Sequence, residues 1–262
     1  MSQNSSNDTM MSFWDHLDVL RASLIKMVLA VAVCGIVAFL FKDELFSVVL
    51  APKYESFITY RLLADVLSGL DMPSMAGFSV KLINTGLSEQ FLIHVKVAVY
   101  AGLMVSSPYI LYLIFSFVSP ALYDSERRYS LQVVGGGYIM FIIGALTSYF
   151  IIFPLTFRFL GTYQVSGEVE NMITLQSYID TFIMMNLTMG LLFELPIVCW
   201  ILAKLGFLTP DFMRRYRRHA IVVILIATAV ITPTSDVFTM SLVAMPIWLL
   251  YEVSILVVPK KK

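Results

Sequence analysis

Long apolar segments constrain this chain more than any other feature of its sequence. A helix needs about 20 consecutive apolar residues to cross a membrane. Six segments approach that requirement, and they cover residues 24–41, 97–118, 133–153, 182–203, 220–231 and 237–258. Since 58% of the 262 residues are hydrophobic and only 14% are charged, the composition is also that of a membrane protein. We therefore predict an all-α integral membrane protein, 1–262, with six transmembrane helices in a single domain.

The last two apolar segments are shorter than the others. Residues 220–231 number twelve, so a helix there would reach about 18 Å, against about 30 Å of hydrocarbon. Pro246 and Glu252 interrupt the sixth segment. A soluble hairpin is the alternative for this pair, but the apolar surroundings favour two spans. Together with Pro108 in the second span, Pro246 predicts bends, and hence a concave bundle with short fifth and sixth helices.

Lysine and arginine are unevenly distributed between the two predicted faces. Twelve of the eighteen lie on one face: Arg21, Lys26, Arg127, Arg128, Lys204, Arg214, Arg215, Arg217, Arg218, Lys260, Lys261 and Lys262. Five lie on the other: Lys42, Lys53, Arg61, Lys81 and Arg158. Lys96 stands at the entry of the second span. Because basic flanking residues stay on the cytoplasmic side, the bias predicts that both termini are cytoplasmic.

The opposite face carries one long loop, residues 42–90. In this loop Tyr54, Phe57, Ile58, Leu62 and Val66 recur at helical spacing. The pattern predicts a helix that lies in the membrane interface and caps the bundle, or else a short core helix of the loop.

Several function classes find no support in the sequence. The formal net charge is zero, which gives no argument for nucleic-acid binding. The sequence contains none of the HExxH, GxSxG or GxxxxGK[ST] signatures, so we predict that the protein is not an enzyme. Its three histidines lie in separate segments, and Cys34 and Cys199 both lie in apolar runs, so we expect no metal site, no disulfide and no cofactor.

Glu194 is an unusual residue for the middle of an apolar span. A carboxylate at that depth is costly unless it is protonated or paired. One interpretation is a neutral acid that is hydrogen-bonded to a neighbouring helix; the other is a polar contact offered to a partner or a pathway. Pro196 deprives the Leu192 carbonyl of its helical donor and predicts a bend beside the carboxylate.

A charged cluster follows the second span, in the stretch FVSPALYDSERR at residues 117–128. Pro120 cannot continue a regular helix, and Glu126, Arg127 and Arg128 follow it. A solvated ion-pair cluster is the simplest interpretation. The alternative is a binding site for a guanidinium group, because Phe117 can stack on its plane while Glu126 forms a bidentate pair with it.

Four motifs occur in an order that resembles the TatC family, the polytopic subunit of the twin-arginine protein translocase. They are HLDVLR at 16–21, FVSPALYDSERR at 117–128, FELP at 193–196 and TPTSDVF at 232–238. Six spans with a short final pair also match this family. The motifs cover nearly the whole chain and are jointly specific.

The resemblance implies a function that composition cannot reveal. It implies recognition of signal peptides with paired arginines, and export of folded proteins across the cytoplasmic (inner) membrane with the proton-motive force. It also implies single-span partners of the TatA and TatB type, contact with membrane lipids, and assembly as a homo-oligomer within a larger complex.

The resemblance also implies residue roles. Phe117 and Glu126 would bind the signal peptide, together with Asp18 and Arg21 of the first motif. The partner helices would contact Glu194 and Met240. The outer turn would contain Pro233 and Asp236.

Two positions depart from the family pattern. Val19 stands where HLxELR has glutamate, and Asp18 precedes it; a shift of one residue turns a helical side chain by about 100°. Met240 stands where the family commonly has glutamine.

Two other classes of function compete with this interpretation. A proton-coupled small-solute transporter also needs carboxylates inside the membrane, but such folds usually repeat broken helices in both halves, and we find no repeat. A purely structural membrane scaffold is disfavoured by the four motifs.

Overall fold

The computed structural model describes residues 13–68, 80–118, 130–164, 166, 171–232 and 236–258. The larger helices are α1 (Phe13–Leu40), α4 (Glu89–Val118), α6 (Ser130–Thr147), α7 (Phe153–Thr162), α8 (Leu175–Leu192), α9 (Leu195–Lys204), α11 (Arg217–Ile231) and α12 (Val237–Val257). The shorter elements are α2 (Lys42–Val49), the 3₁₀ turn η1 (Ala51–Lys53), α3 (Ile58–Ser68), the π-helical turn η3 (Ser148–Ile152) and α10 (Pro210–Arg215). Two strands, β1 (Leu82–Ile83) and β2 (Ile173–Thr174), pair in parallel.

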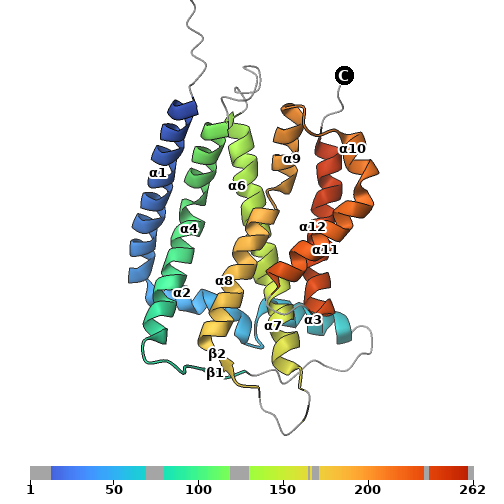
Figure 1. Cartoon of the computed structure of the whole chain (residues 1–262). Helices are drawn as coiled ribbons and strands as arrows, with labels where there is room; N and C mark the ends of the chain where they lie inside the picture. The colour runs from blue at the N-terminus through green and yellow to red at the C-terminus, as the bar shows by residue number, and fades with distance from the viewer. Residues whose placement is uncertain are drawn as a thin grey trace, which may run out of the picture.

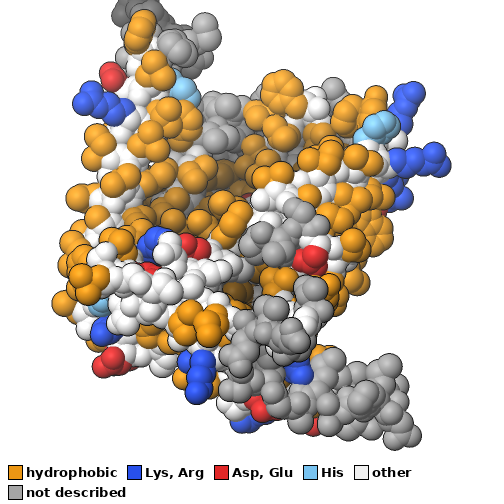
Figure 2. Space-filling view, turned by 60° about the horizontal axis from the view of Figure 1, so that its bottom comes forward, with side chains coloured by type: hydrophobic (Ala, Val, Ile, Leu, Met, Phe, Trp, Pro, Cys, Tyr) orange, Lys and Arg blue, Asp and Glu red, His pale blue; other side chains and the backbone are white. Residues whose placement is uncertain are grey.

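Five helical segments are long and apolar enough to cross a membrane: His16–Leu40, Glu89–Phe117, Val133–Thr162, Leu175–Lys204 and Val237–Val257. The third consists of α6, η3 and α7 in succession, and the fourth of α8 and α9. The all-α membrane fold is therefore confirmed. Hydrophobic side chains cover most of the visible flanks, and the surface is hollowed between the α1–α4 side and the α10–α12 side (Figure 2).

The last two long helices differ from each other in length. At 15 residues α11 would reach about 22 Å, so the helix at the predicted fifth span is short, and it is not among the five segments that are long enough to cross. Helix α12 follows the predicted sixth segment and is the shortest of the five, with 21 residues or about 31 Å. Pro246 lies inside α12 without ending it. A proline removes one donor and need not stop a helix that neighbouring helices hold.

The bundle has two different ends (Figure 1). We call the end where α1 begins and α12 finishes the terminal end; α9 also finishes there. We call the other the capped end, because α2, η1, α3 and the strand pair lie across it. The first and last described residues therefore lie at the same end of the molecule.

Prolines inside the spans free backbone carbonyls, and nearby hydroxyls satisfy two of them. Pro108 leaves the Met104 carbonyl without its helical donor, and the Ser107 hydroxyl donates to it at 2.7 Å. Pro154 does the same to the Phe150 carbonyl in η3, which accepts from the Thr59 hydroxyl of α3. The helix that carries Pro108 stays continuous over 30 residues.

Hydroxyl groups also attach the capped end to the bundle. The Tyr60 hydroxyl lies 2.9 Å from both the Pro52 and the Pro154 carbonyl oxygens. Tyr149 donates to the Val48 carbonyl at 2.8 Å, and Tyr178 donates to the Val49 carbonyl at 2.9 Å. Burial raises the pKa of the Tyr60 phenol, which the Arg158 guanidinium partly opposes, so this hydroxyl stays protonated and able to donate.

Aromatic rings form the core beneath this cap. Phe153 packs edge-on against both Tyr178 and Phe182, with ring centroids 5.1 Å apart in each pair. All three rings are almost fully buried. The close approach of α6 and α8 requires Gly144, because a Cβ there would lie 2.6 Å from the Met189 carbonyl oxygen.

The helix predicted in the long loop is present as α3. Phe57 and Tyr60 are buried, whereas Ile58 and Leu62 are 53% and 60% exposed. The side chain of Val66 lies outside the described structure. The hydroxyls of Thr59 and Tyr60 bond the side of α3 that faces the bundle.

Candidate functional site

At the terminal end, the start of α1 lies beside the finish of α4. The His16 ring stacks on the Phe117 ring with centroids 4.1 Å apart and an angle of 24° between the planes. An aromatic contact therefore joins the first turns of one span to the last turn of another. His16 covers one face of Phe117, and the Phe117 side chain is partly exposed.

Asp18 and Arg21 lie on the same two turns of α1, and both are exposed. The segment 119–129, with Glu126 and its neighbouring arginines, lies outside the described residues. Its two flanking residues, Val118 of α4 and Ser130 of α6, are both at the terminal end. Three predicted peptide-binding residues, Phe117, Asp18 and Arg21, thus lie at one end of the molecule.

Glu194 lies where the fourth span breaks. Helix α8 finishes at Leu192 and α9 begins at Leu195, as Pro196 predicts. The Glu194 carbonyl accepts from the backbone N–H groups of Ile197 and Val198 at 3.0 Å, so α9 starts at this carbonyl.

The Glu194 carboxylate points at helix α6. A Cβ built on Gly137 would lie 3.1 Å from its Oε2 atom. Its Oε1 atom is buried and accepts no hydrogen bond from the described residues. Leaving a buried acceptor unpaired costs about 1–3 kcal/mol. The described structure thus offers no partner for the interpretation as a neutral acid bonded to a neighbouring helix, and the carboxylate keeps an unused acceptor.

The turn before α12 has a structural role at Asp236. Its carboxylate caps the helix by accepting from the Thr239 N–H at 2.8 Å and from the Thr239 hydroxyl at 2.5 Å. Phe238 stacks on Phe159 of α7 with centroids 4.4 Å apart, which fixes the start of α12 at the capped end. Pro233 lies outside the described residues, and Met240 is partly buried on the first turn of α12.

Sequence reasoning missed three polar or close contacts. Arg217 and Glu252 form an ion pair of 2.6 Å between α11 and α12, and Lys96 and Asp180 form one of 2.8 Å between α4 and α8. The contact of Glu194 with Gly137 was also missed, since the glycines of α6 were interpreted as packing residues. Opposite charges near span ends were a usable signal for the two ion pairs. Within the described ranges, no group of three His, Cys, Asp or Glu could hold a metal ion.

Comparison with known proteins identifies the family. The model of the TatC family, described as Sec-independent protein translocase protein (TatC), matches residues 15–246. This chain belongs to the TatC family.

Relatives and solved structures of TatC agree over nearly the full length. The TatC protein of Blattabacterium sp. subsp. Periplaneta americana is 34% identical over 99% of this chain and 100% of its own. That of Carboxydothermus hydrogenoformans is 32% identical over 95% of this chain and 93% of its own. A crystal structure of the twin-arginine translocase receptor TatC in DDM superposes with a TM-score of 0.75 at 31% identity, over 93% of this chain and 99% of that one.

The family membership settles the general function. The chain is a TatC subunit of the Sec-independent protein translocase, a multi-pass integral protein of the cytoplasmic membrane, and a transport component rather than an enzyme. It works within a Tat complex with other Tat components. The small-solute transporter is thereby displaced as an alternative.

Proposed function

We propose that this TatC chain is the receptor subunit of the export system: its terminal end faces the cytoplasm and binds signal peptides that carry paired arginines. With six membrane crossings, α11 would be the fifth, and both termini would be cytoplasmic. The basic residues Arg214, Arg217 and Arg218 at the start of the last helix pair support this orientation, because basic flanks stay on the cytoplasmic side.

The observation that carries the proposal is the His16–Phe117 stack. It brings the first motif, with Asp18 and Arg21, to the finish of α4, from which the segment with Glu126 continues. Two motifs separated by about one hundred positions in the sequence therefore meet at one end of the bundle. A site for two arginines needs at least two acceptors, and Asp18 and Glu126 are suitable carboxylates.

The chemistry of arginine explains why the signal would require it. A guanidinium group offers planar, paired donors to a carboxylate and can stack on an aromatic ring, whereas a lysine ammonium does neither as well. The face of Phe117 opposite His16 would stack on one guanidinium while Glu126 binds it. Arg127 and Arg128 would neutralise Glu126 at rest and release it to the incoming arginines.

Assembly and transport would use a second region. The unpaired acceptor of Glu194 would receive a polar group from a single-span partner of the TatA or TatB type, with Met240 contributing an apolar contact. The complete assembly would contain several copies of this chain and would export folded proteins with the proton-motive force. Lipids would surround its apolar flanks, and no nucleic acid would take part.

Peptide binding to the purified full chain in lipid nanodiscs tests the proposal. Glu126→Gln should weaken the binding of a twin-arginine peptide by about tenfold or more, because a charge-assisted hydrogen bond contributes about 1.5–3 kcal/mol. A twin-lysine peptide should bind the wild type more weakly than the twin-arginine peptide does.

Asp211→Asn is the matched control, since Asp211 is an exposed carboxylate at the terminal end, on the first turn of α10. It should leave binding within about twofold of wild type. If Glu126→Gln bound the twin-arginine peptide as tightly as the control, the site would not include Glu126. If twin-lysine and twin-arginine peptides bound equally, the guanidinium mechanism would be wrong.

A further inference from the structure

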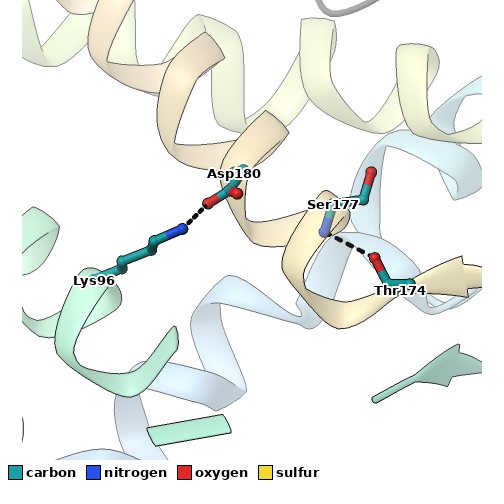
Figure 3. Close-up of polar contacts among 4 residues, drawn as sticks. All are labelled: Lys96, Thr174, Ser177 and Asp180. Carbon is teal, nitrogen blue, oxygen red and sulfur yellow. Dashed lines mark hydrogen bonds and ion pairs between the residues drawn. The ribbon is translucent and has the colours of Figure 1, made fainter. Parts of the chain in front are cut away.

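The ion pair between Lys96 and Asp180 is not used by the proposed function. Lys96 Nζ lies 2.8 Å from Asp180 Oδ1, and the two side chains are 44% and 46% exposed. They point toward each other from two different spans, α4 and α8 (Figure 3). A half-exposed pair of charges on the flank of a membrane protein is costly in hydrocarbon. Its depth in the membrane therefore decides whether it faces acyl chains or lipid headgroups.

The depth follows from helix length. The spanning segments Glu89–Phe117 and Leu175–Lys204 have 29 and 30 residues, about 44 Å each, which exceeds about 30 Å of hydrocarbon by about 14 Å. With that excess divided equally, about 7 Å of each helix projects at the capped end. Lys96 lies seven residues from Glu89 and Asp180 five from Leu175, or about 10 Å and 8 Å along their helices. Both charges therefore lie at the boundary between hydrocarbon and lipid headgroups.

The start of α8 is fixed by a cap, which keeps Asp180 at this level. The Thr174 hydroxyl accepts from the Ser177 N–H at 3.1 Å, one turn before Asp180 (Figure 3). On the other helix, the carboxylate of Glu89, the first residue of α4, accepts from the Gly86 N–H at 2.7 Å.

An apolar groove continues from the ion pair. It encloses about 400 Å³ between α4 and α8. Its apolar walls are Val95, Val99, Leu103, Ile183, Met184 and Leu187. Apart from Val95, these residues lie farther from the capped end than the two charges do, so the groove extends into the hydrocarbon. The site thus consists of an ion pair at the headgroup boundary and an apolar groove that extends from it into the hydrocarbon.

This arrangement is complementary to one class of amphiphile. The ion pair uses one of the three N–H donors of Lys96 and one of the two oxygens of Asp180, so a donor and an acceptor remain for a ligand. An equal pair of opposite charges matches a zwitterionic headgroup: a phosphate faces Lys96 and an ammonium faces Asp180. An ammonium with N–H donors can form a charge-assisted hydrogen bond to the carboxylate, whereas a quaternary ammonium cannot.

We propose that the Lys96–Asp180 pair and the α4–α8 groove bind one phospholipid of the phosphatidylethanolamine class. Its phosphate contacts Lys96, its primary ammonium contacts Asp180, and one acyl chain fills the groove. A phosphatidylglycerol headgroup places negative charge beside Asp180, and phosphatidylcholine lacks the donor.

Native mass spectrometry of the full chain tests this proposal. The protein is equilibrated with equal amounts of phosphatidylethanolamine, phosphatidylcholine and phosphatidylglycerol in mixed micelles, and the retained lipids are counted. We expect the wild type to retain phosphatidylethanolamine about fivefold more than either competitor, the scale of one partly exposed ion pair. Equal retention of the three lipids, or a preference for phosphatidylglycerol, would overturn the proposal.

Substitutions at the ion pair and in the groove separate the headgroup contact from the groove. Asp180→Asn should abolish the preference for phosphatidylethanolamine over phosphatidylcholine, and the double change Lys96→Met with Asp180→Met should do so without leaving an unpaired charge. Met184→Trp fills the groove and should reduce retention of phosphatidylethanolamine. Met245→Trp, on an exposed position of α12, is its matched control and should retain lipid as the wild type does. Unchanged retention in Met184→Trp, with the control also unchanged, would exclude the groove.

Discussion

The capped end and the α1–α4 side of the terminal end differ in how they are built. At the capped end, hydroxyls of Thr59, Tyr60, Tyr149 and Tyr178 donate to backbone carbonyls of other elements, above a buried aromatic core. At the terminal end, a comparable hydroxyl bond, from Tyr251 to the Met213 carbonyl, lies on the α10–α12 side. On the α1–α4 side His16 stacks on Phe117, and the neighbouring charged side chains of α1 are exposed. The difference indicates that the capped end holds the helices in place, while the α1–α4 side of the terminal end presents side chains to other molecules.

The largest expected effect is the loss of stability on removing a buried ring at the capped end, compared with an exposed ring near the terminal end. Phe153→Ala should lower stability by about 3–5 kcal/mol, or roughly 10 °C in the unfolding temperature, because it leaves a cavity in the buried cluster. The same change at Phe207, near the terminal end and 79% exposed, should have little effect. Thermal unfolding of both variants in detergent measures the difference. Equal losses would show that the two ends contribute alike to stability.

An intermediate effect is expected at Glu194, which lies between the two ends of the fourth span. Glu194→Ala should reduce export by about tenfold or more, on the scale of one charge-assisted hydrogen bond to a partner. Binding of twin-arginine peptide should survive, because the peptide site lies at the terminal end. Export from cells and peptide binding to purified protein are measured side by side. Glu44→Ala, an exposed glutamate at the capped end, serves as the control.

Loss of peptide binding in Glu194→Ala, with the complex still assembled, would assign this residue to recognition. Full export activity would instead remove it from the transport mechanism.

The smallest expected effect is at a single hydroxyl of the capped end. Tyr60→Phe should cost about 1 kcal/mol, or roughly 2–4 °C, because the Pro52 and Pro154 carbonyls lose their donor. Tyr54→Phe is the matched control, since Tyr54 is 53% exposed on the same end. A thermal shift no larger than that of the control would mean that the hydroxyl contributes nothing to the cap.

Much of this fold follows from the sequence because hydrophobic length is a strong signal. All five long spans were predicted from apolar runs, and Pro196 predicted the break between α8 and α9. The length of α12 was not predictable from Pro246 alone, because whether a proline ends a helix depends on the helices packed around it. The buried side of α3 depended on two carbonyls about one hundred residues later: that of Phe150, which Pro154 frees, and that of Pro154 itself.

The candidate site was predictable in its residue types but not in its contacts. The motif HLDVLR suggested Asp18 and Arg21, yet nothing in it indicates that His16 stacks on Phe117. Glu194 was conspicuous as a charge in an apolar run, whereas its neighbour Gly137 looked like one of several packing glycines. To predict the ion pair between Lys96 and Asp180, one must know which spans are adjacent, and the periodicity of the sequence does not supply that.

The most direct test of the account is to ask which end contacts the signal peptide. A photo-crosslinking amino acid is placed at Trp14 on the terminal end or at Leu87 on the capped end, both of which are exposed. A twin-arginine peptide is then added to the cytoplasmic side of inverted membrane vesicles. The account predicts a crosslink from Trp14 that unlabelled twin-arginine peptide competes and twin-lysine peptide does not, and none from Leu87. A competed crosslink from Leu87, with none from Trp14, would contradict it.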